Sequence, residues 1–205
     1  VNDKPTDIHV TLEHMGDIYV SSPHMYVYEN VGDGAIVANL SAADQDSGDS
    51  HSFSLVSGSS FNDNDSFTIS GNQLLIKDSP DAEDIDLYNV YIQATDQDGA
   101  SFGQEFAIYA FDINEAPSDI IIDSTPWFEN NASYSTVANL SAADQDSADS
   151  HTFSLVSGSS YADNESFTIS GNELIINDSA DYETQSSYSI RLAATDEDGA
   201  SFEKD

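Results

Sequence analysis

The chain has 205 residues, with 38 Asp and Glu against 4 Lys and Arg, and its formal net charge is -34. This charge argues against nucleic acids and anionic membrane surfaces as partners, because cationic side chains bind both. No apolar run approaches the roughly 18 residues of a membrane-spanning helix. Cysteine is absent, which excludes disulfides, thiolate metal sites and a cysteine nucleophile. Carboxylates at this density need neutralising, and divalent cations or high salt are the candidates.

An internal repeat organises the sequence. Residues 29–102 align with residues 129–202 at a constant offset of 100, without gaps and with about two-thirds identity. A period of this length is too long for a solenoid repeat and fits whole domains in series. We therefore predict two domains, residues 1–114 and 115–205. The first has about a dozen additional residues, within 9–28, for which an extra hairpin is predicted.

Within each repeat the apolar residues alternate as they do in β-strands. In chain order, strands are expected at residues 51–56, 66–69, 73–76, 88–94 and 106–111. The turn Ser70-Gly71-Asn72 predicts a hairpin between the second and third of these. No segment has a helical apolar stripe of useful length. The sequence therefore predicts an all-β chain of two tandem Greek-key sandwiches of the immunoglobulin-like kind, with about seven strands each.

Acidic residues concentrate at the ends of the expected strands. An acid-x-acid triplet, Asp44-Gln-Asp46, follows an early strand, and Asp81-Ala-Glu83 precedes the strand that Asp96 closes. Such triplets can aim two carboxylates at one hard cation, and calcium takes about 6 to 8 oxygen ligands. One triplet alone is a weak signal. Recurrence of these elements at the same offsets in both repeats is a much stronger one, and it predicts calcium binding.

Five motifs together give the chain a resemblance to the cadherin family over essentially its whole length. They are Glu29-Asn30, Ala43-Asp44-Gln-Asp46, Asp81-Ala-Glu83, Ala94-Thr-Asp96 and the linker Asp112-Ile-Asn-Glu-Ala-Pro117. The near-identical repeats and the acidity are most similar to cadherin-like repeats of large bacterial surface adhesins. The linker is shorter than the family pattern, with Glu115 in place of Asp and Ala116 where Asn is usual. This departure leaves the number of ions open.

The resemblance implies two tandem cadherin-like sandwiches joined by a calcium-binding linker, in a secreted, cell-surface protein without enzymatic activity. Calcium ions at the junction would rigidify the repeats for cell adhesion. The implied junction ligands are Glu29, Asp81, Glu83, Asp112, the Ile113 carbonyl, Asn114, Glu115, Asp144, Asp146 and Asp196. Half-sites are implied at Asn2, Asp3, Asp44, Asp46 and Asp96, and at Glu129, Asp181 and Glu183. The implied partners are neighbouring repeats of the same chain, with a homophilic, glycan or cell-surface ligand as further candidates.

Other interpretations stay open beside this one. The acidic loops at residues 63–65 and 84–86 lie outside the motifs and fit a solvated surface. The stretch 9–28 is the place for a carbohydrate- or protein-ligand-binding function. His51 beside Ser50 is not a catalytic pair by itself, because neighbours on a strand point to opposite faces. A glycosidase with paired carboxylates is disfavoured, since no acid lies in an apolar context that would raise its pKa.

Overall fold

The computed structural model describes residues 2–12, 24–46, 48–57, 62–124, 126–158 and 161–205. It divides into two compact units, Val1–Ile113 and Asn114–Asp205, so the division falls one residue before the predicted boundary. Each unit is built of short strands and one short 3-10 helix. Among the described residues, no helix has the length and hydropathy that crossing a bilayer requires.

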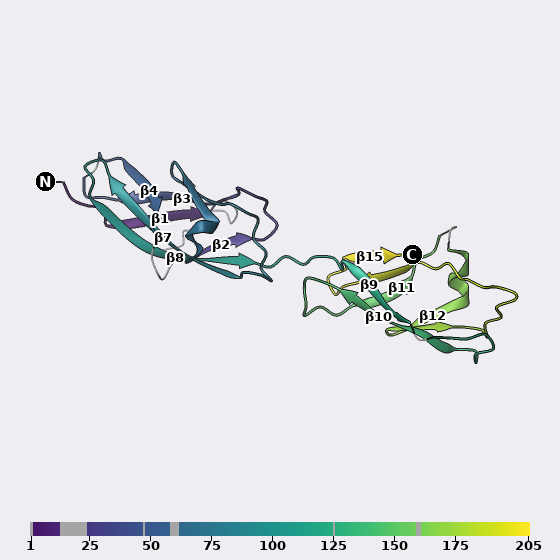
Figure 1. The fold of residues 1–205 in the computed structure, drawn as a ribbon. Helices are drawn as coiled ribbons and strands as arrows, with labels where there is room; N and C mark the ends of the chain where they lie inside the picture. The colour runs from purple at the N-terminus through teal and green to yellow at the C-terminus, as the bar shows by residue number, and fades with distance from the viewer. Residues whose placement is uncertain (1, 13–23, 47, 58–61, 125, 159–160) are drawn as a thin grey trace. The chain divides into compact units, whose positions relative to one another are not determined.

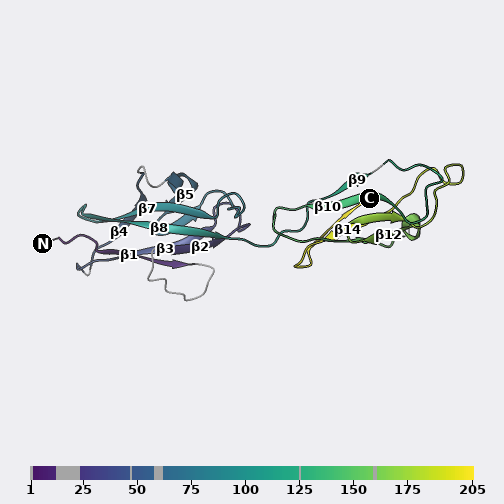
Figure 2. The same ribbon diagram turned by 90° about the horizontal axis from the view of Figure 1, so that it is seen from below.

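The first unit is a sandwich of two four-stranded sheets (Figures 1 and 2). One sheet has the order β1 (Asp7–Leu12), β3 (Ile36–Ala43), β6 (Gln73–Ile76) and β5 (Phe67–Ser70). The other has the order β2 (His24–Tyr28), β8 (Ser101–Phe111), β7 (Leu87–Asp96) and β4 (His51–Leu55). A 3-10 helix, η1 (Asn62–Ser66), precedes β5. Neighbouring strands are antiparallel except β2 and β8, which are parallel.

The core follows from the alternation in the sequence. Along β7, every second residue from Tyr88 to Asp96 is buried, so one face of the strand packs inward and the other faces away. Leu40, Leu74 and Ile76 of the opposite sheet belong to the same buried cluster. The side chain of buried Asn64 donates to the Val56 carbonyl at 2.8 Å and accepts from the Tyr91 amide at 3.1 Å. These two bonds satisfy backbone groups that the strands leave unpaired.

The second unit repeats this arrangement, except that its second sheet has three strands instead of four. One sheet has the order β12 (Phe167–Ser170), β13 (Glu173–Ile176), β10 (Ser135–Ala143) and β9 (Asp119–Ser124). The other has the order β11 (Thr152–Leu155), β14 (Leu192–Thr195) and β15 (Ser201–Lys204). The 3-10 helix η2 (Ala162–Ser166) precedes β12. The prediction of two β-sandwiches is confirmed, and so is the hairpin at residues 66–76, which is β5 and β6.

The stretch 9–28 does not form the predicted hairpin in its described residues. β1 pairs with β3 in one sheet, and β2 pairs with β8 in the other, so the chain passes from one sheet to the other. Both strands bury alternate apolar residues, Ile8 and Val10 in β1 and Met25 and Val27 in β2. Each strand therefore covers a separate part of the core rather than pairing with the other. The intervening residues 13–23 lie outside the described part of the chain.

Candidate metal sites at the ends of the repeats

The first unit gathers an acidic group at the end where its chain begins. Asp44 and Asp46 follow β3, and Asp96 ends β7 opposite His51 of β4. Asn2 Nδ2 donates to Asp96 Oδ2 at 3.0 Å, and the Asp3 amide donates to Asp46 Oδ2 at 2.7 Å. The residues that precede β1 therefore contact the carboxylates at two separate strand ends.

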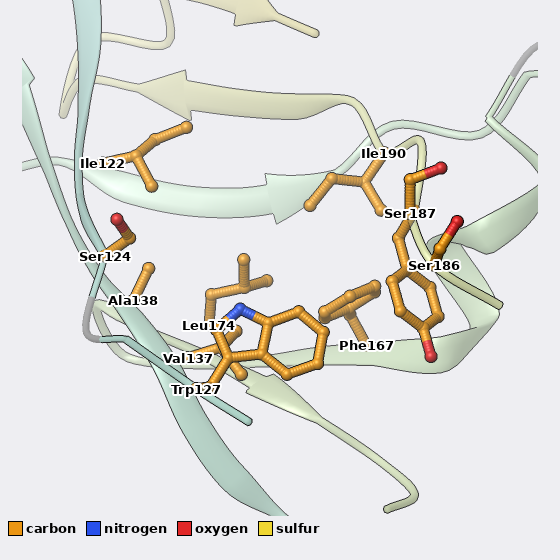
Figure 3. Close-up of a pocket in the computed structure, with 11 residues that line it drawn as sticks. Ile122, Ser124, Trp127, Val137, Ala138, Phe167, Leu174, Ser186, Ser187 and Ile190 are labelled. Atoms are coloured by element: carbon orange, nitrogen blue, oxygen red, sulfur yellow. The ribbon is translucent and has the colours of Figure 1, made fainter. Parts of the chain in front are cut away.

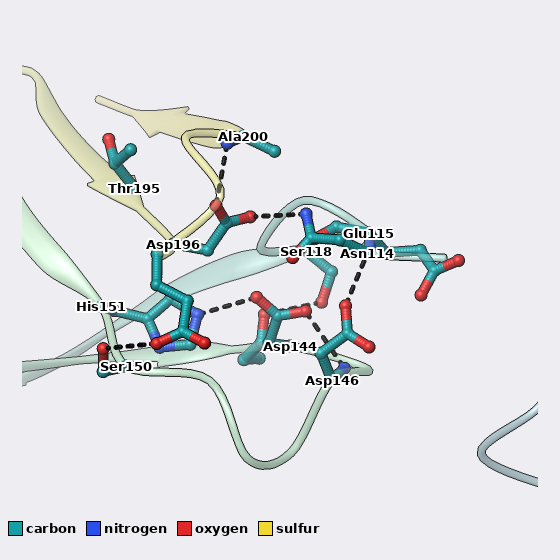
Figure 4. Close-up of polar contacts among 12 residues, drawn as sticks. Asn114, Glu115, Ser118, Asp144, Asp146, Ser150, His151, Thr195, Asp196 and Ala200 are labelled. Atoms are coloured by element: carbon teal, nitrogen blue, oxygen red, sulfur yellow. Dashed lines mark hydrogen bonds and ion pairs between the residues drawn. The ribbon is translucent and has the colours of Figure 1, made fainter. Parts of the chain in front are cut away.

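The second unit builds the same arrangement from its own residues (Figure 4). Asn114 Nδ2 donates to Asp196 Oδ2 at 3.1 Å, and the Glu115 amide donates to Asp146 Oδ2 at 2.8 Å. Asp146 and Asp196 are both buried. Asn114 and Glu115 thus make the same contacts in the second unit as Asn2 and Asp3 make in the first. A contact that recurs in two copies of different flanking sequence is a property of the repeat.

A histidine orients one carboxylate of each group. His51 Nε2 lies 3.0 Å from Asp44 Oδ2, and His151 Nε2 lies 2.7 Å from Asp144 Oδ2. The side chains are 12% and 3% exposed in the first pair and 13% and 3% in the second. The Asp46 amide donates to the other oxygen, Asp44 Oδ1, at 3.0 Å. Both oxygens of Asp44 are thereby held in place. Motif reasoning gave these histidines no role.

Hydrogen bonds favour the ionised form of Asp44, Asp96 and Asp196. The bond with His51 lowers the pKa of Asp44, and backbone amides lower it further. Burial raises the pKa of Asp96, but bonds from Asn2 and from backbone amides near Ala100 outweigh it, and the net pKa is lowered. Asp196 behaves in the same way, with Asn114 in the place of Asn2. An ionised carboxylate is the form that binds a metal ion.

Sequence reasoning missed one member of each group, Asp49 and its counterpart Asp149. Carboxylate oxygens of Asp44, Asp46 and Asp49 lie within 4.8 Å of one another, and so do those of Asp144, Asp149 and Asp196. Burial, with the neighbouring carboxylates, raises the pKa of both Asp49 and Asp149. The available signal was a third acid, three residues after the triplet and repeated at the same offset of 100.

The opposite end of the first unit holds a second acidic group. Glu29 is 1% exposed, accepts from the Ala82 amide at 2.8 Å through Oε2 and accepts from the Ile113 amide at 2.6 Å through Oε1. Carboxylate oxygens of Glu29, Asp81 and Glu83 lie within 4.8 Å of one another. Ile113 therefore meets this group through its N–H, while the predicted role of its carbonyl and that of Asp112 stay predictions.

The equivalent group of the second unit is Glu129, Asp181 and Glu183, also within 4.8 Å and exposed throughout. In both units the residue after the glutamate has a left-handed backbone, with φ of 58° at Asn30 and at Asn130. Asn tolerates this conformation better than most residues. The Glu-Asn motif therefore has a local reason: the Asn turns the chain where the Glu is presented.

All four groups fit a hard divalent cation. Calcium takes oxygen donors, and these groups offer carboxylate oxygens from several loops. Every member of these groups among the described residues is Asp or Glu, so their donors are carboxylate oxygens. Zinc or iron would favour imidazole or thiolate ligands. When bound, calcium would be held by these oxygens and would neutralise their charge.

The second unit also has an apolar pocket of about 230 Å³ (Figure 3). Trp127, Phe167 and Tyr188 line it, together with the serines Ser124, Ser186 and Ser187. The lining residues Phe167 and Tyr188 correspond to Phe67 and Tyr88, which pack with β8 in the core of the first unit. The pocket is therefore lined by residues of the core of the second unit.

The lowered pKa values give a pH prediction. A carboxyl group with a lowered folded pKa binds fewer protons in the folded than in the unfolded state, so stability rises with pH below about 4. In chelator, the unfolding temperature should therefore fall as the pH is lowered through this range. Asp196→Asn should flatten the fall, and Asp198→Asn, on an exposed neighbour in the same turn, should not. Equal slopes for the two variants in thermal unfolding would contradict the assignment.

Comparisons with known proteins place this fold. No family model matches the chain, and no curated protein matches it. Among solved structures it is similar to human protocadherin-24 EC1-2, with a TM-score of 0.64 and 22% identity over 84% of this chain and 82% of that one. The protocadherin gammaB4 extracellular domain gives 0.64 and 24% identity over 90% of this chain and 30% of that one.

A structure of protocadherin gammaB7 EC3-6, described as a cis-dimer, gives a TM-score of 0.62 and 23% identity over 90% of this chain. The chain spans about half of that structure, 45% of its length. These identities are too low to transfer a function, but the likeness covers both units. The chain therefore consists of two repeats with the fold of cadherin extracellular domains.

Proposed function

We propose that this chain is a calcium-rigidified pair of repeats from a secreted adhesin of the bacterial cell surface, with a structural and adhesive role and no catalysis. One observation carries the proposal. In each unit, the residues that precede the first strand donate hydrogen bonds to equivalent aspartates. The donors are Asn2 and Asp3 in the first unit and Asn114 and Glu115 in the second.

Chain connectivity supports coupling between the repeats. Ile113 donates to Glu29 of the first unit, and the next residue, Asn114, donates to Asp196 of the second. Two acidic groups are thus tied to consecutive residues of the backbone. The proposed ligands are the acids of the two groups together with the linker: Glu29, Asp81, Glu83, Asp112, the Ile113 carbonyl, Asn114, Glu115, Asp144, Asp146 and Asp196.

Electrostatics supply the mechanism. Like charges a few ångströms apart repel by about 1–4 kcal/mol per pair at intermediate dielectric. Without cations, two groups of carboxylates on either side of a short linker favour separation. Calcium would replace this repulsion by ligation that fixes both groups to the same ions. The expected result is a linker that is mobile without calcium and stiff with it.

Small-angle X-ray scattering with and without millimolar calcium tests this function. Calcium should narrow the distribution of dimensions of the wild-type chain and should not do so for the triple variant Glu29→Gln, Asp112→Asn, Asp144→Asn. A matched variant, Asp65→Asn, Asp84→Asn, Glu165→Gln, loses the same charge from exposed positions and should respond like the wild type. If the distribution of dimensions of the wild-type chain is the same with and without calcium, the proposal is refuted.

One observation favours a second candidate, binding of a glycan by the first unit. Tyr26 stacks on Phe111 with ring centroids 5.1 Å apart and on Tyr109 at 5.6 Å, and Tyr28 contacts Phe111 at 5.6 Å. Tyr28 and Phe111 are more than a third exposed. An aromatic row of this kind, partly open to solvent, offers faces on which a sugar ring can pack. Binding to a glycan array that is lost in the double variant Tyr28→Ala, Phe111→Ala would support this function. An array to which the wild type does not bind would rule it out.

A further inference from the structure

Asp49 and Asp149 share an unusual state. In each, Oδ2 is buried and no described residue donates a hydrogen bond to it. Buried polar atoms are nearly always satisfied, because an unpaired one loses its hydration without replacement. A carboxylate oxygen is a particularly costly case. The same unsatisfied atom at equivalent positions of two repeats requires a common explanation.

The local structure brings the Asp49 and Asp149 carboxylates into the acidic groups. The Asp49 amide donates to the Asp46 carbonyl at 3.1 Å, and the Asp149 amide donates to the Asp146 carbonyl at 3.0 Å, so a tight turn brings each side chain back towards its triplet. Gln97 Nε2 donates to Asp49 Oδ1 at 2.7 Å, which leaves Oδ2 as the oxygen without a donor. Oxygens of the surrounding aspartates lie within 4.8 Å.

Among the described residues, the charged groups that act on the Asp49 and Asp149 carboxyls are other carboxylates. The Nε2 atoms of His51 and His151 contact Asp44 and Asp144 instead. The remaining members of the groups are carboxylates. A buried anionic oxygen facing other anionic oxygens is destabilising in the absence of a cation. A bound cation at this point would satisfy it and its neighbours together.

We propose that Asp49 and Asp149 are calcium ligands through Oδ2, completing the ion site formed by Asp44, Asp46 and Asp96 in the first unit and by Asp144, Asp146 and Asp196 in the second. The assignment rests on the proposed calcium function and adds to it one ligand per repeat. The loop before β4 and its equivalent before β11 then form part of the metal site rather than a solvated connection.

The assignment predicts effects of opposite sign from one change. In Asp49→Asn, Asp149→Asn, each buried charge is removed and the new amide can donate to a neighbouring carboxylate. In chelator, the unfolding temperature of the 205-residue chain should therefore rise by a few degrees. Loss of an anionic ligand should weaken calcium binding by isothermal titration calorimetry about tenfold or more. A residue with a purely structural role would lower the unfolding temperature instead.

Asp98→Asn, Asp198→Asn is the matched control, because it removes the same charge from exposed residues of the neighbouring turn. It should change calcium affinity less than threefold. If the wild type binds calcium and Asp49→Asn, Asp149→Asn binds it equally tightly, this assignment is wrong while the calcium function stands. If the wild type binds no calcium, both proposals fall. An unfolding temperature lowered in chelator also overturns the ligand assignment.

Discussion

Calcium at about one hundred times its dissociation constant is expected to raise the free energy of unfolding by about 2.7 kcal/mol for each site it fills. For a unit of about 100 residues this corresponds to an increase in unfolding temperature of about 10 °C or more. The physical reason is the acidic group at the end of each repeat, where carboxylate oxygens of three residues lie within 4.8 Å of one another. Thermal unfolding followed by circular dichroism, in calcium and in chelator, measures the effect.

Two controls separate ligation from simple screening. Sodium chloride at matched ionic strength screens the -34 net charge and should recover only part of the increase. Magnesium demands near-octahedral geometry and gives up its water reluctantly, so it should stabilise less than calcium at the same concentration. Equal stabilisation by sodium chloride would mean that the carboxylates act as a diffuse charge and that no specific ion site exists.

Removal of the Glu29 side chain is expected to destabilise the first unit even without calcium. In Glu29→Ala the Ala82 and Ile113 amides lose a charged acceptor, and hydrogen bonds to charged groups contribute about 1.5–3 kcal/mol each. Because the Ile113 amide regains some solvent, a total loss of about 2–4 kcal/mol in the free energy of unfolding is expected. Urea denaturation in chelator gives this quantity directly.

The chain supplies its own control for this substitution. Glu129 is the same residue of the second repeat, but it is exposed. Glu129→Ala should change the free energy of unfolding by less than about 0.5 kcal/mol, as surface substitutions usually do. Equal losses in the two variants would show that burial and the two backbone contacts of Glu29 do not determine its contribution.

Much of the fold could be predicted because its signals are local. Alternation along β7 and the Ser-Gly-Asn turn between β5 and β6 each depend on a few adjacent residues. The repeat then doubled every observation. The pairing of β2 could not be predicted because it is not local: β2 joins β8, more than 80 residues later, and lies parallel to it. No periodicity in β2 itself distinguishes that partner from β1.

The candidate sites divide in the same way. The acid-x-acid triplets and the Glu-Asn motif could be identified from spacing and resemblance. Asp49 and His51 could not, because their roles depend on a turn and on a strand pairing that bring them back to Asp44. A loop acid looks the same in sequence whether its oxygens face water or other carboxylates. Burial of its Oδ2 without a donor, which the structure alone reveals, distinguishes Asp49 from exposed loop acids such as Asp98.

The docking of Asn114 and Glu115 within the second unit, matched by Asn2 and Asp3 in the first, has a consequence for evolution. Each repeat contains the aspartates that bind the residues preceding its own first strand. A new copy inserted between two others would therefore need no matching change in its neighbours. Recombination between nearly identical gene segments can then lengthen or shorten such a protein without compensating mutations. Under the proposed adhesin function, the reach of the protein would then depend on the number of copies.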